Sequence, residues 1–210
     1  MSTTSDQVDG PAGRRERKKL ANRDAMQVAA VELFVESGFE ATTVEAICDR
    51  ADVAPSTFFR HFPTKEDAVL LGLRERLDDL LVNMDAQPAG ADAADFILGA
   101  VSDWRDDRRP ADQLRTEARL IAAEPALQHH LSRMLVDLEA PIAQRLLARF
   151  PEADPLDVDL GAAWFAAAMR VVIRDWSAEA DDRDVFDTGV RAILRLTELL
   201  SMSLGPPATG

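Results

Sequence analysis

Hydrophobic residues recur at helical spacing along nearly the whole chain. The first expected helix, 17–37, places a set of apolar side chains on one face: Met26, Ala29, Ala30, Leu33 and Phe34. Gly38 follows this stripe and is typical of a residue that ends a helix. No segment keeps the strict alternation of a strand. The pattern therefore predicts an all-α fold.

Turn residues and helix caps divide the rest of the chain into further helices. Thr42 and Thr43 begin a short helix that ends near Ala51, and Thr42 with Glu45 has the spacing of a capping box. Further helices are predicted over 55–62, 65–83, 92–107, 111–123, 125–149, 156–179 and 184–203.

Prolines and N-terminal caps set several of these boundaries. Pro55 suits the first position of its helix, and Thr64 caps the helix that follows Pro63. Pro141 lies inside a continuous apolar pattern, so we interpret it as a kink that leaves the carbonyl of Asp137 unpaired.

These helices fall into two expected domains between two tails. Residues 14–65 form a small three-helix domain, and residues 66–204 form a larger helical bundle. Residues 1–13 and 205–210 are rich in Gly, Pro and small polar residues, so we expect both tails to be disordered.

Charge is distributed unevenly along the chain. The formal net charge is −13, yet residues 1–65 carry nine Lys and Arg against ten Asp and Glu. Six of these cations lie within 14–23. A basic end on an acidic body can meet a polyanion in only one orientation. A solvated, disordered basic tail is the other interpretation of this cluster.

Several classes of protein lack support in the sequence. No apolar stretch reaches the length of a membrane span, no secretory signal is visible, and Cys48 has no partner for an internal disulfide. We therefore expect a cytoplasmic protein. His61, His129 and His130 do not combine with other residues at zinc-site spacing, and no phosphate loop, nucleophile elbow or HExxH motif occurs. We expect no metal, no cofactor and no enzyme activity.

Residues 42–65, TTVEAICDRADVAPSTFFRHFPTK, have the form of a helix-turn-helix. Phe58 and Phe62 are four residues apart and give the second helix of this motif one buried edge. The remaining side chains carry hydroxyl, guanidinium and imidazole groups, which suit the major groove of DNA.

The stretch from Arg23 to Glu66 resembles the DNA-binding domain of the TetR family of bacterial regulators. The matching residues are Ala29-Ala30, Phe34, Gly38-Phe39, Thr42-Thr43-Val44, Ile47, Ala51, Val53, Thr57-Phe58-Phe59-Arg60-His61-Phe62 and Lys65-Glu66. Three positions depart from the family pattern: Asp52 replaces a turn glycine, Ala54 a serine cap, and Phe59 a tyrosine that would bond a phosphate.

The resemblance implies a role in DNA binding for eight residues. Thr43, His61 and Lys65 would contact phosphates or sugars. Pro55, Ser56, Thr57 and Arg60 would lie nearest the base edges, with Phe59 against the backbone or a thymine methyl. Thr43 can also be read as a plain helix cap, Phe59 as a core residue, and Arg60 and Lys65 as solvated charges.

The resemblance and the apolar C-terminal helices together predict a homodimer that responds to a small molecule. Residues 160–173 are apolar nearly all round, and 184–203 carry a wide apolar stripe, so the last two long helices would form the dimer interface. A larger monomeric core is the alternative. Candidate ligand contacts are Phe96, Trp104, Met134, Trp164, Phe165, Met169 and Arg170. Most of these are also compatible with the core, and Arg170 with a salt bridge.

The sequence therefore predicts a dimeric regulator that binds near-palindromic operator DNA and is released by a small, largely apolar effector. Two alternatives stay open: an activator or a regulator controlled by a protein partner, and a helical protein-interaction module that does not bind DNA. The effector, the operator sequence and the regulated genes are not encoded in any recognisable motif.

Overall fold

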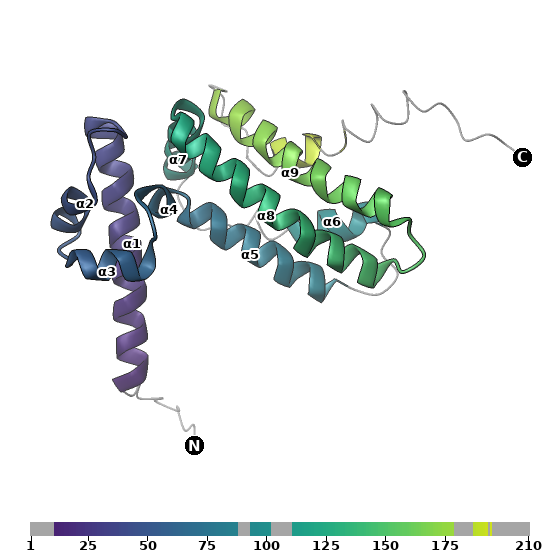
Figure 1. The fold of residues 1–210 in the computed structure, drawn as a ribbon, viewed down its shortest axis with the longest axis horizontal. Helices are drawn as coiled ribbons and strands as arrows, with labels where there is room; N and C mark the ends of the chain where they lie inside the picture. Colours follow the sequence, from purple (N-terminus) through teal and green to yellow (C-terminus); the bar gives the residue numbers. More distant parts are fainter. Residues whose placement is uncertain (1–10, 88–92, 102–110, 179–186, 193, 195–210) are drawn as a thin grey trace, which may run out of the picture. The chain divides into compact units, whose positions relative to one another are not determined.

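A computed structural model describes residues 11–87, 93–101, 111–178, 187–192 and 194 of the 210-residue chain (Figure 1). Its helices are α1 (Pro11–Ser37), α2 (Val44–Arg50), α3 (Pro55–His61), α4 (Lys65–Val69), α5 (Leu71–Ala86), α6 (Ala93–Val101), α7 (Ala111–Ala123), α8 (Pro125–Arg149) and α9 (Pro155–Ala178). No strand occurs among these residues, so the described part has the predicted all-α fold.

The chain divides into two compact units. The first, here called the head, contains Met1–Leu71, and the second, here called the body, contains Gly72–Gly210. The division falls six residues after the boundary expected at residue 65. The reason is that Ala68, Val69 and Leu70, which follow the helix-turn-helix, are buried hydrophobic residues.

Helix α1 is longer than the sequence pattern predicts. It begins at Pro11 rather than near residue 17, and Pro11–Gly13 therefore belong to a helix and not to the N-terminal tail. The apolar stripe starts only at Met26, so periodicity could not find this segment. Arg, Glu, Lys and Ala are good helix formers, and proline is favoured in the first turn.

The two threonines before α2 have different roles. Thr43, not Thr42, is the N-cap, and its hydroxyl accepts a hydrogen bond from the backbone N–H of Ala46 at 3.1 Å. The Thr42 hydroxyl instead donates to the carbonyls of Leu33 and Gly38 at 3.2 and 2.8 Å. Thr42 therefore satisfies carbonyls at the C-terminal end of α1, which is why the predicted Thr42–Glu45 capping box does not form.

The turn residues behave as their chemistry predicts. Gly38 ends α1 with a φ of 84°, a backbone conformation that residues with a side chain rarely adopt. Asp52 adopts a φ of 52° in the turn between α2 and α3, where glycine was expected from the family pattern. Aspartate tolerates this left-handed conformation better than most residues, so the substitution preserves the turn.

One helix was predicted where the structure has two. Residues 65–83 were expected to be continuous, but α4 ends at Val69 and α5 begins at Leu71. Leu70 between them has a ψ of 1°, outside the helical range. Thr64 caps α4 as predicted: Thr64 and Asp67 form a complete capping box.

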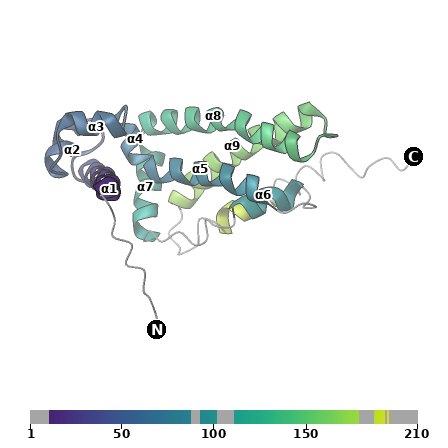
Figure 2. The same ribbon diagram turned by 90° about the horizontal axis from the view of Figure 1, so that it is seen from below.

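The core of the head lies where α1, α2 and α3 meet. Figure 2 views α1 nearly end-on, with α2 and α3 beside it. The largest fully buried side chains of the head are Met26, Ile47, Cys48, Phe58, Phe62, Val69 and Leu70. Cys48 is 1% exposed, and burial raises the pKa of its thiol, with smaller contributions from Glu45 and Asp49. The thiol is therefore held in its protonated form.

The body is built around the long helices α8 and α9, which pack against each other and against α7. Helix α8 continues through Pro141 as one helix, as the uninterrupted apolar pattern predicted, while the kink and the unpaired carbonyl of Asp137 stay predictions. Arg145, one turn later, donates to the carbonyls of Leu81 at 3.0 Å and Pro141 at 3.2 Å and pairs with Asp85. This side chain therefore connects α8 to α5.

Some expectations fall outside the described residues. These are Trp104, both predicted tails apart from residues 11–13, and most of the predicted helix 184–203, of which 187–192 are helical. Among the described helices, none is both long enough and apolar enough to cross a membrane.

Candidate nucleic-acid interface and ligand pocket

Helix α3 is fixed to the head by two phenylalanines. The side chains of Phe58 and Phe62 are 0% and 2% exposed, and their ring centroids are 5.3 Å apart. Ala54 provides no side-chain cap, but Pro55 occupies the first turn with its favoured geometry. The buried edge predicted from the spacing of the two phenylalanines is therefore present and sets the orientation of α3.

The opposite side of α3 is open to solvent. Pro55, Ser56, Phe59 and Arg60 are exposed, and Thr57 is half-buried. Phe59 is 57% exposed, and its ring meets the edge of Phe58 at a centroid distance of 5.6 Å. Phe59 is thus a surface residue rather than the core residue that remained an alternative. An exposed aromatic ring beside hydroxyl and guanidinium groups fits a DNA groove.

Positive charge gathers at the C-terminal end of α3. His61 is half-buried, and its pKa is lowered first by burial and then by Arg60, Lys19 and Arg23. Its buried Nε2 has no hydrogen-bond partner among the described residues. Arg60, unlike many surface arginines, makes no ion pair within the described part of the chain. The guanidinium is therefore available to a ligand.

Lys65 points into the head. Its ammonium donates to the backbone carbonyls of Phe39 at 2.6 Å and Thr42 at 3.0 Å, and it lies 4.0 Å from the Phe39 ring centroid. These bonds hold the loop between α1 and α2 and use two of the three ammonium protons. The sequence suggested a phosphate contact for Lys65 but gave no sign of this structural role.

Helix α2 is tied to α1 by an ion-pair cluster that the sequence analysis missed. Arg50 donates to Glu36 at 2.8 Å and to Glu32 at 3.2 Å. These carboxylates raise the pKa of Arg50, and Arg50 lowers the pKa of Glu36. The four-residue spacing of the two glutamates was a detectable signal. Exposed ion pairs contribute little to stability, but these bonds link α2, the helix capped by Thr43, to α1. Thr43 itself is exposed.

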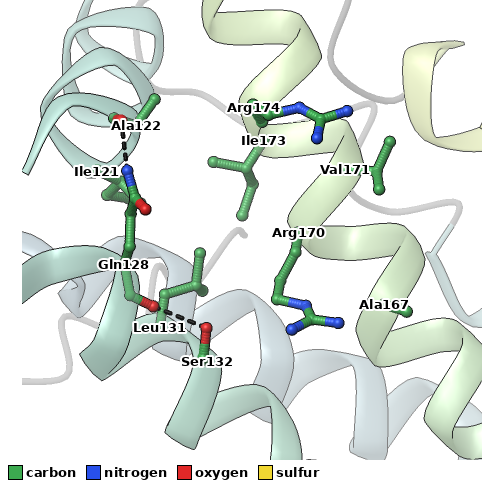
Figure 3. A pocket seen from close by; sticks show the side chains of 10 residues that line it. All are labelled: Ile121, Ala122, Gln128, Leu131, Ser132, Ala167, Arg170, Val171, Ile173 and Arg174. Carbon is green, nitrogen blue, oxygen red and sulfur yellow. Dashed lines mark hydrogen bonds between the residues drawn. The ribbon is translucent and has the colours of Figure 1, made fainter. Parts of the chain in front are cut away.

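The body contains a pocket of about 460 Å³ between α7, α8 and α9 (Figure 3). Its lining is mostly apolar and includes four polar side chains: Ile121, Ala122, Leu131, Ala167, Val171 and Ile173, with Gln128, Ser132, Arg170 and Arg174.

Hydrogen bonds order the α8 wall of the pocket. Gln128 donates to the carbonyl of Ala122 at 2.5 Å, and the Ser132 hydroxyl donates to the carbonyl of Gln128 at 2.8 Å.

The two arginines of the pocket differ in their surroundings. Arg174 pairs with Asp175 at 2.8 Å. Arg170 makes no ion pair with any described residue, and Figure 3 shows its side chain extending from α9 toward the α8 part of the pocket. An apolar pocket with one unpaired guanidinium suits an apolar molecule that carries an anionic group.

The predicted ligand residues are dispersed in the structure. Phe96, Phe165 and Met169 are buried, and Phe96 stacks edge-on against Phe150. Met134 is half-buried and Trp164 is 38% exposed. Of the described members of the set, Arg170 alone lines the 460 Å³ pocket. On α8 the pocket is lined by Gln128, Leu131 and Ser132.

An apolar strip runs along one side of α9. Leu156, Leu160 and Trp164 are each between 38% and 64% exposed, and their spacing of four residues keeps them on one face. Val171 lies further along the helix on this face and lines the pocket. Large exposed apolar strips on soluble proteins mark interaction sites. In the described part of the chain, no group of His, Cys, Asp and Glu is arranged to hold a metal.

Comparison with known proteins places both units in one family. Residues 28–70 match the family described as "Bacterial regulatory proteins, tetR family", and residues 94–201 match the "MftR C-terminal domain". The HTH-type transcriptional regulator TcmR of Streptomyces glaucescens is 33% identical over 190 residues, which are 85% of this chain and 83% of TcmR. The repressor KstR2 of Rhodococcus jostii is 38% identical over 76 residues, 36% of this chain and 33% of KstR2.

Solved structures show the same fold. Salmonella enterica GusR has a TM-score of 0.52 at 23% identity and covers 93% of this chain and 100% of its own. NalD of Pseudomonas aeruginosa has a TM-score of 0.54 at 17% identity, with coverage of 87% and 96%. With a helix-turn-helix head, a helical body and these matches over both units, the chain is a transcriptional regulator of the TetR family.

Proposed function

We propose that the protein binds a near-palindromic operator as a homodimer, represses transcription there, and leaves the DNA when a small anionic, largely apolar molecule binds the body. The observation that supports DNA binding is the exposed face of α3. It presents Ser56, Phe59 and Arg60 to solvent while Phe58 and Phe62 anchor the helix. Since bacterial promoters lie in the cytoplasm, this function places the protein there.

The eight predicted DNA contacts have different roles in this proposal. The exposed residues of α3, with Thr57, read base edges, and Phe59 packs on the backbone or a thymine methyl. Thr43 and His61 contact phosphates, with the free amides of α2 beside Thr43. Lys65 has one proton left for a phosphate after holding the loop. Its main contribution is to keep α2 and α3 in place.

The first test is the sequence preference of Arg60→Ala. The wild-type protein is used to select duplexes from a random-sequence pool, and the selected duplex and a scrambled version are then titrated. Loss of the guanidinium is expected to cost about 1–3 kcal/mol on the selected duplex and to relax one base position, because arginine pairs with guanine at two atoms. Equal losses on both duplexes would contradict base reading by Arg60.

Lys65→Ala is the matched comparison for this experiment. It removes one positive charge from the same unit but should weaken all duplexes alike. It should also lower the stability of the head, because the carbonyls of Phe39 and Thr42 lose their partner.

Homodimerisation is supported by the strip on α9. Leu156, Leu160 and Trp164 give an exposed apolar surface on a helix whose buried residues pack within the body. A two-fold dimer presents two α3 helices to two half-sites about 34–36 Å apart, and this spacing explains why the operator should be near-palindromic. The predicted helix 184–203 would complete the interface.

Repression, rather than activation, is supported by the names of two similar proteins. KstR2 is a repressor, and the solved structure of NalD is that of the secondary repressor of an efflux pump. FasR of Mycolicibacterium smegmatis, 33% identical over 75 residues, is an activator. A reporter driven by the promoter that contains the selected operator separates the two: repression predicts a higher signal when the gene for this protein is deleted.

Effector binding is tested with 8-anilinonaphthalene-1-sulfonate, which combines an apolar ring system with one sulfonate. We expect Arg170→Gln to weaken its binding about threefold to tenfold, because the charge-assisted hydrogen bond is lost. Arg174→Gln is the control, since that guanidinium is paired with Asp175. The selected operator should reduce the dye's affinity by the same factor by which the dye reduces operator affinity. Equal dye affinities with and without operator would identify a pocket that is not coupled to DNA.

A further inference from the structure

Helix α1 projects beyond the compact part of the head. Its buried side begins at Met26, whereas every residue from Arg14 to Ala21 is exposed. Figure 1 shows α3 crossing α1 part of the way along, with the N-terminal part of α1 continuing past it. The match to the TetR family begins only at residue 28. Residues 11–25 therefore lie outside the family match.

The projecting segment is strongly basic. Residues 14–23 contain six cations and one acid, and Lys19 is paired with that acid, Glu16, at 3.3 Å. Arg14, Arg15 and Lys18 make no ion pair with any described residue. Arg14 and Lys18 are four residues apart, as are Arg15 and Lys19. Like charges at this spacing destabilise a helix, and the segment gains no burial in return.

The charges of the head are separated along its length. Residues 32–52 carry six acids and one arginine, which Glu32 and Glu36 neutralise. The basic end of α1 instead lies toward α3: Lys19 and Arg23 are close enough to His61 to lower its pKa, together with Arg60. Glu16 acts on His61 in the opposite direction, but it is the single acid among six cations of residues 14–23. Positive charge on α1 therefore lies beside the C-terminal end of α3.

We propose that the basic segment of α1, residues 14–23, binds the phosphate backbone of the operator beside the half-site read by α3. This proposal rests on the operator binding proposed above. The segment spans about 14 Å at the rise of an α-helix, and duplex DNA carries about one charge per 1.7 Å of its axis. The segment can therefore face several phosphates at once.

The contact is to the backbone and not to bases. Arginine forks match phosphate oxygens in two-point geometry, and the polar residues of the segment are cations and Glu16 except for Asn22, which is half-buried. Phosphates placed against Arg14, Arg15 and Lys18 also remove the mutual repulsion of these side chains. The segment thus adds affinity and fixes the position of the head, while α3 provides the sequence preference.

The test compares two double variants that remove the same charge. Arg14→Gln/Lys18→Gln changes the proposed contact, and Arg119→Gln/Arg133→Gln removes two exposed arginines from the body. Glutamine keeps the helix propensity, which circular dichroism verifies. Each protein is titrated with the operator selected by the wild type, over a series of salt concentrations. We expect the first variant to bind at least about tenfold more weakly at 0.15 M salt, with a salt slope smaller by about three to four for a dimer. The control should retain both values.

Phosphate-ethylation interference then locates the contact. Ethylation of the phosphates that contact the basic segment should block binding of the wild type but not of the first variant. Ethylation of the phosphates that contact Lys65 and Thr43 should affect both proteins equally. An additional variant, Arg14→Lys, keeps the charge and should keep the slope. An unchanged salt slope in Arg14→Gln/Lys18→Gln would overturn the proposal, as would an equal change in the control. Failure of the wild type to enrich any sequence would instead overturn operator binding itself.

Discussion

Phe58→Ala is expected to destabilise the head by about 3–5 kcal/mol, because it removes a fully buried aromatic ring from the centre of the helix-turn-helix. Phe58 also positions Phe62 and Phe59, whose rings lie 5.3 and 5.6 Å from its own. Hydrogen exchange of the full-length protein measures the effect locally. Peptides that cover α2 and α3 should exchange at least about a hundredfold faster, while peptides from α8 should not change.

Phe59→Ala is the matched control, one residue away on the exposed side of α3. It should leave exchange in the head unchanged, because a surface substitution alters stability by about 0.5 kcal/mol or less. Its expected effect is weaker DNA binding, since the exposed ring is proposed to touch the backbone or a thymine methyl. Similar exchange rates in the two variants would show that Phe58 does not hold α3 in place.

Leu160→Asp combined with Trp164→Asp is expected to give a monomer that binds the operator about a hundredfold or more weakly. Both side chains are exposed on α9, so the substitutions should not disturb the fold of the body. In a two-fold interface, the two new carboxylates of each protomer lie near those of the partner, so like charges in an apolar surface oppose association. A monomer has one head, and it loses the gain in affinity from engaging two linked half-sites.

Sedimentation velocity at micromolar concentration measures the association, and fluorescence anisotropy measures operator binding. Val136→Asp is the control, because Val136 is an exposed apolar residue on α8. That variant should remain dimeric. A double α9 variant that still sediments as a dimer would place the interface elsewhere on the chain.

Local chemistry was enough to predict most of the helices. Proline, glycine and capping threonine set both ends of α3, α7 and α8, the start of α4 and the end of α1 within a residue or two of the observed positions. Phe58 and Phe62 gave the buried edge of α3 from their spacing alone. These features depend on residues within one or two turns, so they can be read along the chain.

Contacts between distant segments were less predictable. The choice between Thr42 and Thr43 as the cap was decided by the carbonyls of Leu33 and Gly38, which attract the Thr42 hydroxyl. Lys65 looks like a phosphate ligand in sequence but is held by carbonyls 23 and 26 residues away. Neither arrangement leaves a periodic signal in the sequence.

The pocket shows the same limit. The predicted ligand residues were chosen as large apolar side chains, and such residues fill space rather than leave it. Phe165 and Met169 are buried in the core, whereas the pocket is lined by aliphatic residues such as Ile121 and Leu131 and by polar ones such as Gln128. A cavity forms where the side chains of neighbouring helices leave space unfilled. Its position can be predicted only from the relative positions of those helices.

The sheltered position of Cys48 makes this chain suitable for site-specific labelling. It is the sole cysteine in the sequence, and its thiol is buried and held in the unreactive protonated form. A cysteine introduced at the exposed Glu40 should therefore react with a nitroxide reagent while Cys48 does not. Pulsed dipolar spectroscopy on the labelled protein would then follow the head-to-head separation in the proposed dimer, with operator or dye added to the same sample.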